Sequence, residues 1–223
     1  MKRINLLLLG LLVFSSSYLL TTALLEDQNI QVVGNLEPIK FSMVNMKRTL
    51  DPIINIRVNG GACSGVVISD NYALTAAHCV VGSLGYMTDK KVMIESSNTY
   101  SVMYADVVAV EKLRDVAFIH GDFTNFIPMV VDFKGRYMKD KLHMWSCGFP
   151  SGGYALYCTD LRHTGNYYFR YKTKGGPIYK GMSGGPVINK AANVLIGLNS
   201  AVVIDGVIVS PLIGVLELVG LEI

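Results

Sequence analysis

The chain has 223 residues, of which 51% are hydrophobic and 17% charged, and its formal net charge is +3. This length suffices for one large or two small hydrophobic cores. Removing the first 25 residues leaves 18 of the 20 basic residues against all 17 acidic ones, a charge of about +1. So small a charge gives no support to a nucleic-acid or polyanion partner, and we expect no nucleic acid to bind.

The N-terminus combines a basic start with a long apolar stretch. Lys2 and Arg3 precede the almost wholly apolar or small residues 4–25, and Thr21-Thr22-Ala23 offers a small-residue cleavage site. This arrangement is typical of a secretory signal. A stretch of about 22 such residues is also long enough to span a bilayer. We therefore predict that residues 1–25 are a signal peptide or a membrane anchor and that the rest is exported, either secreted, periplasmic or attached to the membrane through residues 4–25.

The remainder of the chain has the pattern of an all-β protein. Residues 26–50 are weakly periodic and are predicted to form an N-terminal arm, and from Asp51 onward short β-branched runs alternate with Gly, Asn and Asp. The first set of predicted strands is Ile53–Val58, Cys63–Ser69, Tyr72–Thr75, Lys91–Glu95, Ser101–Val110 and Val116–His120. The second set is Leu142–Cys147, Ala155–His163, Tyr167–Lys172, Pro186–Asn189, Val194–Ser200 and Val207–Ser210.

These two sets predict two domains. The first covers residues 51–125 and the second residues 141–223, with an interdomain crossover over 126–140 that contains Pro128 and Gly135. Only residues 212–219 look helical.

One segment carries the features of a nucleophilic serine. Gly181-Met182-Ser183-Gly184-Gly185-Pro186 predicts a tight turn in which backbone N–H groups point outward beside the serine hydroxyl. A serine nucleophile and a developing oxyanion need this local geometry. The same string also occurs in ordinary turns, so further residues are required before it indicates an enzyme.

Two other stretches supply side chains that would activate this serine. Thr75-Ala76-Ala77-His78-Cys79 carries a histidine, whose ordinary pKa suits a general base. Asp115 precedes the apolar run 116–119, and its carboxylate would orient the imidazole. Asp106 is the competing candidate, but it lies inside an alternating strand pattern. The alternatives are an ordinary histidine and an aspartate that caps a strand.

With the order His, Asp, Ser along the chain, residues 50–218 resemble the trypsin/chymotrypsin-like serine proteases, especially compact bacterial and viral branches such as the HtrA-type proteases. The resemblance implies a chymotrypsin-like double barrel of two six-stranded antiparallel barrels, with the active site in the cleft between them. It implies a serine endopeptidase that acts on polypeptides without a cofactor. His78, Asp115 and Ser183 would be catalytic, and the N–H groups of Gly181 and Ser183 would form the oxyanion hole.

The resemblance also implies where the substrate pocket lies. In the family, the segment just before the nucleophile and a later strand line this pocket. Counting back from Ser183 without gaps places the pocket base at Pro177 and Ile178, and the wall, which also pairs with the substrate backbone, at Asn199-Ser200-Ala201. None of these residues is charged, so we predict an uncharged residue before the scissile bond. Asp205 is the nearby carboxylate that would instead favour Lys or Arg.

The residue before the nucleophile separates this chain from the trypsin-type zymogens. In those proteins a freed α-amino group pairs with an aspartate at this position, which is Met182 here. An ammonium group buried beside methionine would lose its hydration without gaining a partner. We therefore expect Gln31-Val32-Val33-Gly34, which resembles an activated N-terminus, to have no activating role.

Export makes disulfides the expected state of the four cysteines, for which three connectivities exist. Pairing within each half of the chain joins Cys63 to Cys79 and Cys147 to Cys158, and the first pair also matches the family. Buried free thiols are the alternative. We expect no metal site, because the chain has no Cys-x-x-Cys and ligand spacing is missing at His120, His143 and His163.

Two other functional classes are weighed against a protease. A catalytically silent binding module with a protease fold is the main alternative, although such proteins usually lack a triad member. An esterase would use the Gly-x-Ser-x-Gly pattern of residues 181–185. Esterases of that type place Asp and His after the serine, and no histidine follows Ser183, so we reject this class.

Overall fold

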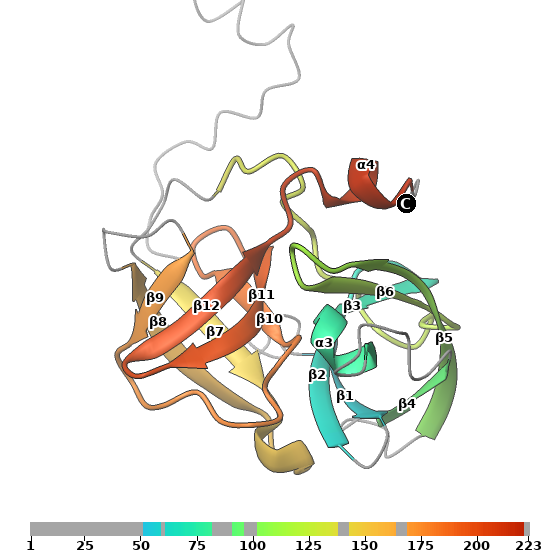
Figure 1. The fold of residues 1–223 in the computed structure, drawn as a ribbon, viewed down its shortest axis with the longest axis horizontal. Coiled ribbons are helices and arrows are strands. Elements are labelled where there is room, and N and C mark those ends of the chain that lie inside the picture. The colour runs from blue at the N-terminus through green and yellow to red at the C-terminus, as the bar shows by residue number, and fades with distance from the viewer. Residues whose placement is uncertain are drawn as a thin grey trace, which may run out of the picture. The chain divides into compact units, whose positions relative to one another are not determined.

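The computed structural model describes residues 51–58, 61–81, 91–95, 102–137, 143–163 and 169–220. These residues form two closed antiparallel barrels (Figure 1), with strand orders β1-β2-β3-β6-β5-β4 and β10-β11-β12-β9-β8-β7. The predicted all-β fold with two six-stranded barrels is confirmed. The predicted leader and arm, residues 1–50, lie outside the described residues. No helix within the described ranges is long and apolar enough to cross a membrane.

The first barrel takes its core from strands whose inward residues are apolar. Its strands are β1 Ile53–Val58, β2 Gly61–Val67, β3 Tyr72–Thr75, β4 Lys91–Glu95, β5 Val102–Glu111 and β6 Val116–His120. Burial alternates along β5, where Ala105 and Val107 point inward and their neighbours are exposed. Strand β1 is buried on both faces, because Ile54 and Ile56 fill the barrel while Ile53 packs toward the second barrel.

The second barrel repeats this architecture. Its strands are β7 Met144–Gly148, β8 Tyr157–His163, β9 Arg170–Thr173, β10 Pro186–Asn189, β11 Val194–Val203 and β12 Gly206–Pro211. A separate apolar cluster joins residues of both barrels, including Leu74 and Phe118 from the first and Phe149 and Leu198 from the second. This shared core fixes the barrels against each other, so side chains from the two halves can form one site.

Three short helical segments complete the described chain. They are α3 Ala77–Val80, the 3-10 helix η1 Pro150–Gly152, and α4 Val215–Val219. The sequence pattern did not predict α3 or η1, because a single turn is too short to show a helical period. Helix α4 begins three residues after the predicted start, since Gly214 takes a left-handed conformation with φ 64° immediately before it. Strand β8 likewise begins at Tyr157, two residues later than predicted.

Both disulfides are present in the structure. Cys63 is joined to Cys79, and Cys147 to Cys158. The first bond connects β2 to α3, and the second connects the neighbouring strands β7 and β8, where the two cysteines stand opposite each other. The four sulfur atoms are therefore no longer thiols, which excludes the free-thiol alternative within this structure.

Candidate active site

The imidazole of His78 is held by the carboxylate of Asp115. Strand β3 is buried and ends at Thr75, so the chain emerges at α3 with the His78 side chain 47% exposed. The His78 Nδ1 atom lies 2.8 Å from Oδ2 and 3.1 Å from Oδ1 of Asp115. The backbone N–H of His78 donates to Oδ1 at 2.8 Å. These contacts orient the ring so that Nδ1 is engaged and Nε2 remains available.

Asp115 reaches this position from the turn before β6. Its backbone is left-handed, with φ 53°, a conformation that aspartate tolerates better than most residues. A third donor, the Ser200 hydroxyl on β11, binds Oδ2 at 2.6 Å. Asp115 and His78 belong to the first barrel and Ser200 to the second, so this cluster bridges the two. Asp106, the competing candidate, lies on β5 with its side chain 53% exposed and 3.8 Å from Lys91.

The contacts between His78 and Asp115 raise the pKa of the histidine and lower the pKa of the aspartate. The hydrogen bond with Asp115 raises the pKa of His78 above its ordinary 6.5, and the negative charge adds to this, although partial burial lowers it. Burial alone would raise the pKa of Asp115, but hydrogen bonds from His78 and Ser200 outweigh it and lower that pKa. Asp115 therefore stays ionised, and the pair favours an imidazolium on His78.

Ser183 lies in a turn that is pressed against the first barrel. Its carbonyl accepts the backbone N–H of Ser64 at 2.7 Å, and the Cys79 Sγ atom lies 3.9 Å from the same oxygen. Cys79 is the neighbour of His78, so the serine and histidine segments are in contact. The Ser183 hydroxyl donates no hydrogen bond to any described residue.

Glycine at position 184 is what permits this approach. Gly184 has φ 77°, and a Cβ there would lie 2.3 Å from Thr75 Oγ1 and 2.4 Å from the Ser64 carbonyl oxygen. Both distances are far below any van der Waals contact, so a larger residue would push the Ser183 turn away from the end of β3.

A hydrogen bond fixes the orientation of the peptide between Lys180 and Gly181. The Lys180 carbonyl accepts a hydrogen bond from the Ser151 N–H at 2.6 Å. Because the carbonyl and the N–H of one trans peptide point in opposite directions, the Gly181 N–H points away from Ser151. Gly181 has φ 95°, and a Cβ would lie 2.7 Å from both the Phe149 carbonyl oxygen and the Ser151 nitrogen. Neither the Gly181 nor the Ser183 N–H has a partner among the described residues.

Side chains from both barrels fix this turn. The Ser64 hydroxyl donates to the Gly181 carbonyl at 2.9 Å and accepts the Phe149 N–H at 2.8 Å, while fully buried. Met182 is fully buried, and its carbonyl accepts the Asn199 amide at 3.2 Å. The Asn199 amide also donates to the Cys147 carbonyl at 3.0 Å. The two residues before Ser183 are therefore held by side chains from both barrels.

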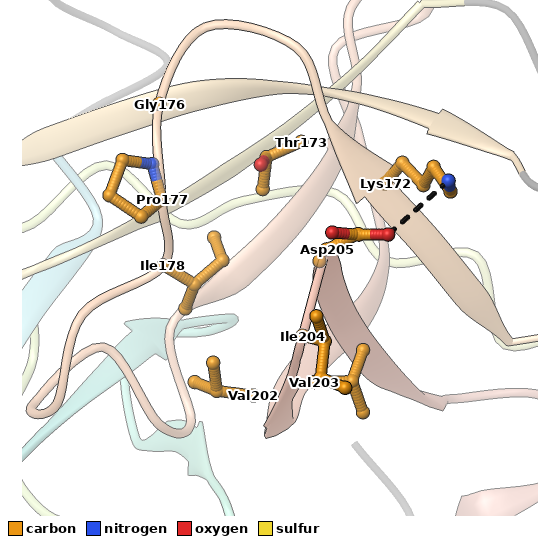
Figure 2. A pocket seen from close by; sticks show the side chains of 10 residues that line it. Lys172, Thr173, Gly176, Pro177, Ile178, Val202, Val203, Ile204 and Asp205 are labelled. Atoms are coloured by element: carbon orange, nitrogen blue, oxygen red, sulfur yellow. Dashed lines mark ion pairs between the residues drawn. The ribbon is translucent and has the colours of Figure 1, made fainter.

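The residues expected to line the substrate pocket lie in two different surroundings. Pro177 and Ile178 line a hollow of about 560 Å³, together with the hairpin at 202–206. Figure 2 shows these two residues on one side and the hairpin facing them. Asn199 is 1% exposed, and its side chain points into the interior, while Ser200 contacts Asp115 and Ala201 is exposed. The assignment of Asn199-Ser200-Ala201 to a pocket wall stays a prediction.

Asp205 enters this hollow already paired with a cation. Its Oδ2 atom lies 3.4 Å from the Lys172 Nζ atom, as the dashed line in Figure 2 marks. The remaining lining includes Val202, Val203 and Ile204, so the hollow combines aliphatic side chains with one charge pair. A second hollow, of about 480 Å³, adjoins Asp115 and Ser200 and is lined by Phe169, Ile208 and Ile213 among others.

Among the described residues, His78, Cys63 and Cys79 form a group of potential metal ligands. Their ligand atoms lie within 4.8 Å of one another. Both cysteines are disulfide-bonded, so neither offers the thiolate that a zinc site would require. This cluster is the disulfide beside the histidine and does not fit a metal.

The sequence analysis missed the roles of three polar residues of the site. The Ser64 hydroxyl and the Ser151 N–H hold the Gly181 turn, and Ser200, which was predicted only as part of a pocket wall, also binds Asp115. Ser64 and Gly181 are 117 residues apart, and Ser200 and Asp115 are 85 apart. No local pattern indicates such pairs. The one local indication for Ser64 is that it follows Cys63, whose disulfide partner Cys79 is the neighbour of His78.

Comparisons with known proteins bear on the family and the fold of this chain. A family model of the trypsin-like peptidase domain matches residues 63–198. No curated protein sequence matches the chain. Among solved structures, the chain is similar to the Rv3671c protease in its inactive form, with a TM-score of 0.60 and 20% identity over 78% of this chain and 91% of that one. A mutant of Rv3671c from M. tuberculosis H37Rv, also in an inactive form, has a TM-score of 0.58 and 20% identity, over 78% of this chain and 86% of that one. A serine endoprotease from Yersinia pestis has a TM-score of 0.57 and 20% identity, over 77% of this chain and 63% of that one.

Proposed function

Because the chain belongs to the trypsin-like peptidase family, we propose that it is an exported serine endopeptidase with His78, Asp115 and Ser183 as its catalytic triad. The observation that carries this proposal is the Asp115 carboxylate, which receives hydrogen bonds from the His78 ring, the His78 backbone and Ser200. Such a carboxylate keeps Nδ1 protonated and leaves Nε2 free to act as a base.

The proposed reaction follows the acyl-enzyme route. The Ser183 Oγ atom attacks the carbonyl carbon of the scissile peptide while its proton passes to His78 Nε2. The carbonyl oxygen becomes an oxyanion, which accepts hydrogen bonds from the N–H groups of Gly181 and Ser183. His78 then gives the proton to the leaving amine as the C–N bond breaks. Water, deprotonated by His78, hydrolyses the ester in the second half of the cycle and restores the serine.

One contact must close when the substrate binds. The Ser183 hydroxyl makes no hydrogen bond with a described residue in the free protein. Catalytic hydrogen bonds of free enzymes are often long and shorten in the substrate complex. We expect the Ser183 hydroxyl to turn toward His78 by rotation about its Cα–Cβ bond, because Ser64 and Gly184 already fix the turn that carries it.

The substrate class is polypeptide, and the pocket chemistry supports an uncharged residue before the scissile bond. Ile178 lies five residues before Ser183 and lines the first hollow with the uncharged Pro177. Asp205, the carboxylate that would attract Lys or Arg, is paired with Lys172 at 3.4 Å. Such a pair offers little net charge to an incoming side chain.

Export is supported by the disulfides as well as by the leader. Bonds of this kind persist in oxidising compartments and are rare in the cytosol. The alternative function is a catalytically silent module with a protease fold. Two features favour catalysis over it. The His78–Asp115 pair is formed beside the segment that carries Ser183, and the N–H groups of Gly181 and Ser183 have no internal partner within the described ranges.

A fluorophosphonate probe tests the proposal without knowledge of the substrate, because it reacts only with an activated serine. We expect it to label the exported part of the chain, and to fail with Ser183→Ala and with His78→Ala. Peptide-library cleavage by the same preparations should fall by several orders of magnitude in both variants. A wild-type protein that stays folded but is neither labelled nor active would favour the silent module.

A further inference from the structure

The 3-10 helix η1 follows a strand of the second barrel, but its polar contacts reach the first. It packs against β1 and β2 of the first barrel. The Gly152 carbonyl accepts hydrogen bonds from Arg57 Nη2 at 2.6 Å and from the Asn55 amide at 3.2 Å. Both donors lie on β1. The first barrel therefore holds the end of η1.

Arg57 is itself fixed by an acidic partner. The Arg57 Nε and Nη2 atoms each lie 3.0 Å from Oε2 of Glu95 on β4, and the Glu95 side chain is only 14% exposed. A Cβ at Gly152 would lie 2.4 Å from Arg57 Nη1, so the guanidinium rests directly on the Gly152 backbone. A planar group with several donors can bind a carboxylate and a carbonyl at once, which a lysine ammonium does less well.

Between Arg57 and the nucleophile turn lies a residue in an unfavourable conformation. Ser151 has φ 53° and ψ 21° inside η1, a left-handed backbone that costs energy for any residue with a Cβ. Such a conformation persists only where the surroundings hold it. The contacts on its two sides are the Gly152 carbonyl bound by Arg57 and the Ser151 N–H bound to the Lys180 carbonyl at 2.6 Å.

These contacts form one continuous path from the first barrel to the oxyanion hole. The orientation of the Lys180 carbonyl decides where the Gly181 N–H points, and Ser151 sets that orientation. We propose that Arg57, held by Glu95, is a positioning residue that aims the Gly181 N–H at the substrate carbonyl. This proposal rests on the function proposed above. It assigns a catalytic consequence to an ion pair that touches neither the substrate nor the triad.

Kinetics of Arg57→Met, in which the side chain keeps its bulk but loses its donors, provide the first test. We expect kcat to fall by about 10-fold to 10²-fold, because one oxyanion donor is worth roughly 10² to 10³. KM should change by less than about 3-fold, since ground-state binding is untouched. The affinity for a peptide boronic acid, whose oxygen occupies the oxyanion hole, should fall with kcat. The pH midpoint of activity should not move, because His78 and Asp115 keep their contacts.

Lys91→Met is the matched control, since Lys91 also lies in the first barrel and pairs with Asp106 through an exposed contact of 3.8 Å. It should leave kcat unchanged. Glu95→Gln and Arg57→Lys, which disturb the structure less, should give intermediate losses and serve if Arg57→Met does not fold. An unchanged kcat in the folded variants, a loss confined to KM, or an equal loss in the control would overturn the assignment.

A measurement that needs no activity separates this proposal from the proposed function. In protein labelled with ¹⁵N-glycine, the Gly181 amide signal is identified by its loss in Gly181→Ala. We expect that signal to shift or broaden in Arg57→Met and Glu95→Gln and to stay in place in Lys91→Met. An unchanged Gly181 signal refutes the positioning role. If the wild-type protein is inactive but the Gly181 signal shifts in Arg57→Met, the proposed enzyme is refuted while the structural coupling stands.

Discussion

Replacing Asp115 by asparagine removes one charge at the centre of the site and reverses one hydrogen bond. The carboxylate now accepts three times, from the His78 ring at 2.8 Å, from the His78 backbone N–H at 2.8 Å and from Ser200 at 2.6 Å. In Asp115→Asn, the remaining oxygen faces the backbone N–H, which must have an acceptor. The new NH₂ group then faces Nδ1 of His78. Nδ1 must accept, so the proton moves to Nε2, and the ring can no longer take a proton from Ser183.

The expected loss follows from this wrong tautomer. We predict a fall in kcat of about 10⁴-fold, or about 5.4 kcal/mol, which is the effect of this change in the serine-protease triad. The oxyanion hole is untouched, so some rate above water should remain. The pH dependence should shift as well. The hydrogen bond and charge of Asp115 raise the pKa of His78 above 6.5, so wild-type activity should rise with pH through a midpoint above that value. Without the charge, the midpoint should move down.

The assay compares fluorophosphonate labelling rates and kcat/KM on a library-selected peptide over the neutral pH range, with thermal unfolding as a check on the fold. Asp106→Asn is the matched control, because Asp106 lies in the same barrel, but its side chain is 53% exposed and forms an exposed ion pair with Lys91. It should keep full activity. The reasoning is refuted if folded Asp115→Asn retains a tenth of wild-type kcat/KM, or if Asp106→Asn loses as much.

Four further predictions follow from the same contacts. Replacing Cys63 and Cys79 together by serine should lower the free energy of unfolding by about 3 kcal/mol, as expected for a loop of this length, and should slow labelling; equal melting curves would contradict it. Gly181→Ala should reduce kcat by about 10²-fold or more while the protein stays folded, because a Cβ would displace the turn; normal turnover would show that the N–H is not used. Cleavage profiles should favour uncharged residues before the scissile bond, and a preference for Lys or Arg would implicate Asp205. Chains that begin at Val32 and chains that keep residues ahead of it should have similar specific activity, and activity in the trimmed form alone would contradict the argument from Met182.

The strands were predictable because each is encoded in a short local pattern. Ile53–Val58 and Val116–His120 are runs of β-branched and apolar residues bounded by turn residues, and their bounds match the structure. The boundaries drifted where the turn chemistry was ambiguous, as at Tyr157, where Gly and Tyr residues precede the strand. The triad motifs were recognisable because the Gly-rich turn and the Ala-Ala-His-Cys segment each have a local conformational requirement.

The parts of the site that could not be predicted depend on contacts between distant residues. The Arg57 guanidinium and the Gly152 carbonyl are 95 residues apart, and the Ser64 hydroxyl reaches across 117 residues to Gly181. An arginine in a strand looks like an ordinary solvated residue until a second barrel brings a carbonyl within 2.6 Å. The left-handed conformation of Ser151 could not be predicted either, since Pro-Ser-Gly is compatible with many turns. Tertiary contacts determine both the role of Arg57 and the conformation of Ser151.

The position of Met182 explains why these distant contacts carry so much of the site. A trypsin-type aspartate at this position would need a buried ammonium partner, and the loop would be ordered only after that partner arrives. Met182 is instead fully buried among apolar residues, and its Sδ atom accepts the Tyr179 N–H at 3.4 Å. Packing of this kind fixes the centre of the loop but says nothing about the direction of the peptide between residues 180 and 181. That direction is set from outside by the Ser151 N–H, which binds the Lys180 carbonyl, while Ser64 holds the next peptide through the Gly181 carbonyl. The proposed oxyanion hole would therefore be assembled only when the two barrels fold together.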